Sequence, residues 1–114
     1  MGTINQVFIL GHLGADPEFH VTTAGHSRCL ISVATHHISG QKPEEKEVTW
    51  HRVKLWRQNA DVARNHLKKG DSVGIVGRIV HEEWTNKDDE QRKSTFIVAE
   101  RLTLIGSRRP SRQE

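Results

Sequence analysis

The stretch from Val48 to Arg57 alternates two kinds of side chain, and this pattern constrains the fold more than any other feature of the sequence. Its β-branched and aromatic residues are typical of a β-strand, whose successive side chains point to opposite faces. One face carries the apolar pair Val53 and Leu55, with Thr49 and His51, and we expect it to pack against a core. The other face combines indoles with cations: Val48, Trp50, Arg52, Lys54 and Trp56.

We expect the two indoles on the outer face to be covered by a ligand or by another protein surface. An uncovered tryptophan forgoes roughly 1.5–3 kcal/mol of burial free energy. Rings that stack bases, interleaved with cations that contact phosphates, are typical of proteins that hold single-stranded nucleic acid without reading its sequence. The alternative is a second core or a subunit contact, since tryptophan also favours interfaces. Because Arg52 and Lys54 lie between the rings, we favour nucleic acid over a dry core.

Length and charge agree with this hypothesis. The chain has 114 residues, which suits one domain, and a formal net charge of +3. Five acids and one base fall between Glu82 and Gln91, so the rest of the chain is more basic than the total indicates. A basic protein surface suits a polyanionic partner. There is no long apolar run or signal-like segment, and the lone Cys29 cannot form an internal disulfide, so we expect a cytoplasmic protein without a membrane segment.

The order of predicted elements indicates the fold. Alternation predicts strands over residues 4–10, 27–36, 48–57, 72–84 and 95–105, with a short extension over 19–23, a polar loop over 39–47 and a hairpin tip over 86–91. The spacing of Ala60, Ala63 and Leu67 predicts one helix, with Asn59 as N-cap, Lys68 and Lys69 in its last turn and Gly70 as C-cap. We therefore predict an all-β protein with one short helix, a five-stranded Greek-key barrel of the OB-fold type. In that fold the face of the second and third strands binds oligonucleotides.

Metal-binding and catalytic alternatives have weaker signals. The eight histidines are scattered and there is no Cys-x-x-Cys, so we expect no metal site. The acidic run from Asp88 to Glu90 is better explained as a solvated hairpin tip than as a magnesium site. No nucleophile, base and orienting residue occur at a recognisable spacing. We expect no cofactor and no enzymatic activity.

Taken in order, several segments are similar to the bacterial single-stranded DNA-binding protein family. The resemblance runs from about Ile4 to Gly106 and implies an OB-fold homotetramer, without catalytic activity, that coats single-stranded DNA in replication, repair and recombination. Residues 1–106 would form the DNA-binding domain and 107–114 a short, disordered basic tail, in a nucleoid-associated protein. The matching segments are 11–18 (GHLGADPE), 31–35 (ISVAT), 49–53 (TWHRV), 60–63, 67–70 (LKKG), 77–78, Trp84 and 98–100.

The resemblance also implies roles for individual residues. Trp50, Trp56 and Trp84 match the base-stacking aromatics of the family, and Arg52 and Lys69 match basic positions near the DNA path. His51 matches a residue at the subunit contact, although strand alternation turns it inward. The candidate DNA-binding set is completed by cations on the predicted strands: Lys54, Arg28 and Arg78.

Some positions depart from the family pattern and leave alternatives open. Glu82 and Glu83 stand where basic residues are usual, which makes Trp84 the weakest binding candidate. The sequence has no acidic, hydrophobic-tipped tail, so contacts with replication or repair proteins stay open. The alternatives are a dimeric factor like primosomal replication protein N, acting with a helicase, and an OB module that binds another protein.

Overall fold

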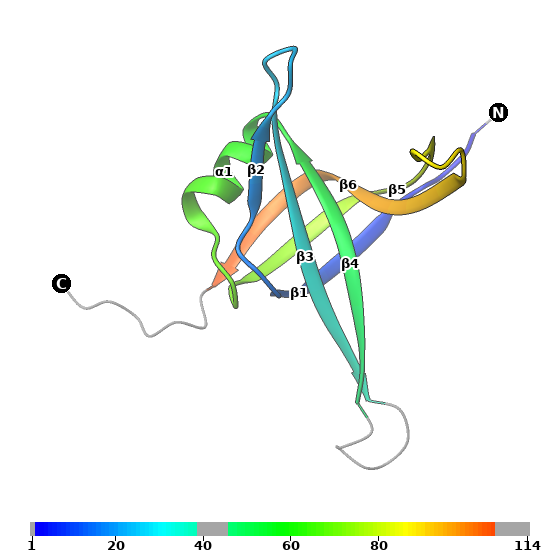
Figure 1. The fold of residues 1–114 in the computed structure, drawn as a ribbon. Helices are drawn as coiled ribbons and strands as arrows, with labels where there is room; N and C mark the ends of the chain where they lie inside the picture. The colour runs from blue at the N-terminus through cyan, green and yellow to red at the C-terminus, as the bar shows by residue number, and fades with distance from the viewer. Residues whose placement is uncertain (1, 39–45, 107–114) are drawn as a thin grey trace.

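The structure, a computed structural model, describes residues 2–38 and 46–106 (Figure 1). Its elements are β1 (Val7–Leu13), β2 (Glu18–Val21), β3 (Ser27–Ile38), β4 (Lys46–Trp56), α1 (Gln58–His66), β5 (Ser72–Thr85) and β6 (Gln91–Gly106). The sheet has the strand order β1-β5-β6-β4-β3-β2, and β1 also pairs with β3. That additional pairing closes β1, β3, β4, β5 and β6 into a barrel, with β2 added at the edge of β3. The predicted five-stranded OB-type barrel with one helix is confirmed.

The barrel interior is filled by the inward face of each strand. On β4, Val53 and Leu55 are fully buried, as their alternation predicted, and they lie opposite Ile31 and Cys29 of β3. The helix α1 lies against one end of the barrel (Figure 1) and buries Ala60 and Ala63 completely. The remaining buried apolar side chains of this core come from the other four barrel strands and the segment after the helix: Ile9, Leu13, Val33, Leu67, Val73, Ile75, Ile97 and Ala99.

The ends of the helix differ from the prediction. The residue at its N-cap is Arg57, with φ 55°, and the predicted cap Asn59 lies inside the first turn. The helix ends at His66, because Leu67 adopts an extended conformation and inserts into the core. Lys68 and Lys69 therefore lie beyond the helix rather than in its last turn. Gly70, with φ 93°, belongs to this following turn and is not the C-cap.

The first strand begins later than expected, at Val7 rather than Ile4. Before it, the Asn5 side chain takes the place of a strand partner for Ile79: its Nδ2 donates to the Ile79 carbonyl at 2.9 Å, and its Oδ1 accepts from the Ile79 amide at 3.0 Å. The predicted extension over 19–23 is β2 at 18–21. Of the predicted 39–47 loop, residues 46 and 47 lie in β4, while 39–45 lie outside the described residues, as does the predicted tail at 107–114.

Two long hairpins, β3–β4 and β5–β6, extend from the barrel (Figure 1). The β3–β4 pairing continues without a break from Arg28 opposite Trp56 to Ile38 opposite Lys46. The β5–β6 pairing shifts register between Val76 and Gly77. Any side chain at Gly77 would collide with the Val98 carbonyl. In the sheet, β4 lies between β3, its partner in the first hairpin, and β6 of the second hairpin.

Candidate nucleic-acid interface

The outward side chains of β4 are Trp50, Arg52, Lys54 and Trp56, and we call them the Trp–cation face. Their orientation follows from the burial of Val53 and Leu55, because a strand whose alternate residues fill a core must turn the others outward. Trp50 is 57% exposed and Trp56 is half-buried. The two indoles stand six residues apart, about 20 Å along the strand, which is too far for both to stack on one flat group.

Trp50 lies across β3 and rests on the backbone at Gly14. It is paired with Ala34 of β3, and the Gly14 amide donates to the Ser32 carbonyl of the same strand at 3.0 Å. A Cβ atom built on Gly14 would overlap Cζ3 of Trp50 and lie 2.5 Å from its Cη2. The absence of a side chain at Gly14 therefore allows the indole to take this position.

The two cations of the face share an aromatic support that strand alternation alone did not reveal. The guanidinium carbon of Arg52 lies 4.6 Å, and the Lys54 Nζ 4.2 Å, from the centre of the Phe96 ring on β6. Phe96 points outward on its strand, yet it is almost completely covered. Cations over an aromatic face are attracted by the ring quadrupole, so Phe96 holds both side chains near the seam between β4 and β6.

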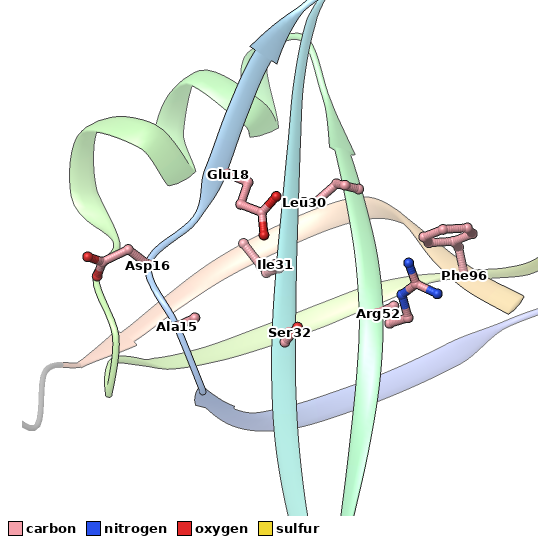
Figure 2. A pocket seen from close by; sticks show the side chains of 8 residues that line it. All are labelled: Ala15, Asp16, Glu18, Leu30, Ile31, Ser32, Arg52 and Phe96. Atoms are coloured by element: carbon pink, nitrogen blue, oxygen red, sulfur yellow. The ribbon is translucent and has the colours of Figure 1, made fainter. Parts of the chain in front are cut away.

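Arg52 and Phe96 also line a cavity of about 250 Å³ at the Trp–cation face (Figure 2). Its other lining residues come from β3, from the segment that joins β1 to β2 and from the first residue of β2, and they include two carboxylates. Asp16 is already engaged, because its Oδ1 accepts a hydrogen bond from the Lys69 amide at 2.8 Å. The remaining lining residues are Ala15, Glu18, Leu30, Ile31 and Ser32.

The structure brings three further sequence candidates to or near this face. Arg28 stands directly opposite Trp56 across the β3–β4 pair. Arg78 and Lys54 are both paired with Val98 of β6, on either side of it, so they point to the same side about 10 Å apart. Lys69 lies in the turn after α1, where its backbone is tied to Asp16.

Other candidates are placed differently. Trp84 lies near the tip of the β5–β6 hairpin, 48% exposed, and its neighbours Glu82 and Glu83 pair with Lys54 and Lys93. His51 is turned toward the interior, and its Nε2 lies 2.9 Å from the Thr35 hydroxyl. Its predicted role at a subunit contact stays a prediction.

Sequence reasoning assigned no role at this face to Gly14 or Phe96, and it related Glu82 to Trp84 rather than to Lys54. Strand alternation could have indicated that Phe96 and Glu82 point outward, because Phe96 shares a face with Val98 and Glu82 shares a face with Trp84. Nothing in the sequence indicates that Glu82 reaches Lys54, 28 positions earlier in the chain, at 2.6 Å. The contact between Gly14 and Trp50 depends likewise on the packing of distant segments.

Two other kinds of site, a reactive cysteine and a metal centre, find no support in the described residues. Burial, with a smaller contribution from the charge of Glu18, raises the pKa of the Cys29 thiol to about 11, so it is not an activated nucleophile. Within residues 2–38 and 46–106, no group of three or more His, Cys, Asp or Glu side chains is placed to hold a metal ion. The described part of the chain contains no helix of sufficient length and apolarity to cross a bilayer.

Comparison with known proteins agrees with this geometry. The profile of the Single-strand binding protein family matches residues 4–105. A single-stranded DNA-binding protein of Neisseria meningitidis serogroup A is 36% identical over 110 residues, covering 93% of this chain and 62% of the relative. The proteins of the same name from Xylella fastidiosa and Deinococcus radiodurans are 34% and 38% identical, covering 92% and 91% of this chain but 65% and 35% of their own lengths.

The chain thus spans less than two thirds of each of these relatives, while the family profile covers nearly all of the barrel and both hairpins. On the strength of that match, the chain belongs to the single-strand binding protein family.

Proposed function

We propose that this protein binds single-stranded DNA without sequence preference, and that the strand crosses the Trp–cation face. The observation that carries the proposal is the outward alternation of Trp50, Arg52, Lys54 and Trp56 on β4. Indoles can stack on any base because every base has a π-face, while the cations neutralise phosphates. Membership of the single-strand binding protein family, together with relatives named single-stranded DNA-binding proteins, supports DNA as the ligand.

The activity that follows is binding rather than catalysis. A protein that covers unpaired bases shields them from pairing and from attack, which fits a protective role in DNA replication, repair and recombination. A ligand of this kind also implies a cytoplasmic, nucleoid-associated location. Arg28, Arg78 and Lys69 would extend the phosphate contacts to either side of β4, and Trp84 would add an aromatic contact from the β5–β6 hairpin.

We further propose that copies of the chain associate through the apolar outer surface of β1, β5 and β6, to form the tetramer that the resemblance implies. On β1, Phe8 is 71% and Leu10 66% exposed, and they border a shallow groove with Val76 and Ile105. Monomeric proteins rarely leave such an apolar surface open. Moreover, β1 pairs with β5 along residues 7–12 but with β3 only at His12 and Leu13, so among the described strands one edge of residues 7–11 is unpaired.

Titration with an oligo-dT strand, followed by intrinsic tryptophan fluorescence, tests DNA binding. We expect quenching, and an affinity that falls linearly with the logarithm of salt concentration as counterions are displaced. Trp50→Ala and Trp56→Ala should each weaken binding by about 1–3 kcal/mol, the value of one stacked base. Because these variants lose a fluorophore, their affinities are measured by anisotropy of a labelled oligonucleotide.

Val48→Ala provides the matched control, since Val48 is an exposed apolar residue on the same face of the same strand but carries no ring. Its affinity should equal that of the wild type. If the double variant Trp50→Ala/Trp56→Ala binds oligo-dT as tightly as the unaltered chain, stacking on β4 is excluded.

A further inference from the structure

Lys54 differs from the other cation of the Trp–cation face in being already paired. Its Nζ lies 2.6 Å from Oε2 of Glu82, and its side chain is only 11% exposed. The same Nζ sits over the Phe96 ring. A pair in this partly desolvated position is screened by salt much less than one on an open surface. Arg52, over the same ring, has no ion-pair partner among residues 2–38 and 46–106.

Glu82 is bonded to the ammonium group that a phosphate would have to contact at this position. It lies on the outward side of β5, on the same side as Phe96 and Trp84. Its carboxylate contacts the Lys54 ammonium group, and the Glu82 side chain is 43% exposed. A carboxylate and a phosphate oxygen seek the same donors, so the two compete for one ammonium group.

We propose that Glu82 is a built-in competitor of the DNA backbone: it neutralises Lys54 in the free protein and must be displaced before Lys54 can contact a phosphate. Glu82 therefore lowers the affinity for single strands and reduces the number of counterions released on binding. The inference rests on the proposed function, since it names a residue that adjusts affinity at the same site. The displaced carboxylate can turn into solvent, so the exchange needs no movement of the strands.

The experiment compares Glu82→Gln with Glu83→Gln. Both changes remove one negative charge from neighbouring residues of one strand. Glu83, however, points to the opposite side, where it pairs with Lys93 at 3.9 Å, both side chains being well exposed. A general electrostatic effect would act on both variants alike, whereas release of Lys54 occurs only in Glu82→Gln.

In oligo-dT titrations at several salt concentrations, one additional phosphate contact adds about 0.7 to the salt slope for a single strand, which corresponds to about fivefold tighter binding at 0.1 M salt. We expect this change for Glu82→Gln and less than a twofold change for Glu83→Gln. In a Lys54→Met background, Glu82→Gln should no longer improve binding, because the cation that it releases is absent. Thermal melts of each variant establish that the fold is retained.

The outcomes separate the two proposals. If the wild type fails to bind oligo-dT at low salt, the proposed function is wrong and the inference falls with it. If the wild type binds and Glu82→Gln behaves like Glu83→Gln, binds more weakly, or keeps its gain without Lys54, the proposed function stands and the competitor role of Glu82 is wrong.

Discussion

Replacing Gly14 by alanine tests whether the position of Trp50 is built into the barrel. The added methyl group would overlap Cζ3 of the indole and lie 2.5 Å from Cη2, which no real Cβ contact tolerates. The neighbour that must move is a side chain more than half exposed, and it can rotate into solvent. The backbone at Gly14 is not in the left-handed region, so alanine itself is accommodated.

These features allow the effects on stability and on binding to be separated. At a compatible backbone position, Gly→Ala stabilises a protein by about 0.4–1 kcal/mol through the unfolded chain. The loss of the Trp50 contact offsets part of this gain, so the melting temperature should change little. Binding should weaken, because the indole loses its preorganised position; the upper limit is the value of one stacked base, about 1–3 kcal/mol. Since the displaced ring can still reach a base, we expect about 1 kcal/mol, or roughly fivefold.

The assay is anisotropy of a labelled oligo-dT strand, with thermal unfolding measured in parallel. Gly106→Ala is the control, because nothing lies within 4 Å of a Cβ at that position. Gly11→Ala provides the opposite case, since its methyl group would meet the Ala34 carbonyl of the backbone and should destabilise the fold. In a Trp50→Ala background, Gly14→Ala should have no further effect on affinity. Unchanged affinity of Gly14→Ala in the wild-type background would refute the reasoning.

Three further predictions concern other parts of the molecule. Since the pKa of the Cys29 thiol is raised from 9.0 to about 11, this thiol ionises at a lower pH in the unfolded chain than in the folded one, and the free energy of unfolding should fall as the pH rises from 9 to 11. At neutral pH a thiol reagent should label Cys29 no faster than the chain opens. Labelling at the rate of a free thiol would contradict the burial of Cys29. Asn5→Ala removes both hydrogen bonds to Ile79 and should lower the free energy of unfolding by about 1–2 kcal/mol in denaturant titrations; no change would show that these bonds are replaced by water. Phe8→Asp should reduce the native mass to that of smaller assemblies without loss of circular dichroism, and an unaltered mass would exclude the apolar face of β1 as the contact.

Strand alternation accounts for most of what could be predicted. Val53 and Leu55 have to enter the core together, and the two-residue period of a strand then fixes the outward direction of Trp50 and Arg52. The same two-residue period holds on the neighbouring strand, where Cys29 and Ile31 are buried. The order of five strands with one helix between the third and fourth was enough to predict the barrel.

Local signals were less reliable where tertiary packing overrides them. Asn59 is a good N-cap residue, but the chain enters the helix earlier, from β4, and Arg57 takes the cap position. The lysines after Leu67 suit a helix C-terminus, yet burial of Leu67 ends the helix before them. The start of the helix is therefore determined by the connection from β4, and its end by the burial of Leu67 in the core.

The details of the Trp–cation face depend on contacts between distant segments. Trp50 meets Gly14 only because the segment after β1 packs beside β3, and Lys54 meets Phe96 only because β4 lies beside β6. Alternation shows that Glu82 points outward, but it does not show which cation it meets. The residues of the Trp–cation face were therefore predictable from the sequence, whereas the contacts that each of its charged side chains makes could be known only from the structure.

The most direct test of the proposed interface is to locate the bound strand. Ultraviolet cross-linking of an oligo-dT strand to the wild-type protein, followed by mass spectrometry of the digested complex, identifies the residues that contact bases. We predict cross-links within residues 48–57, at Trp50 and Trp56. Cross-links confined to the outer surface of β1, β5 and β6, with none on β4, would contradict the assignment of the Trp–cation face.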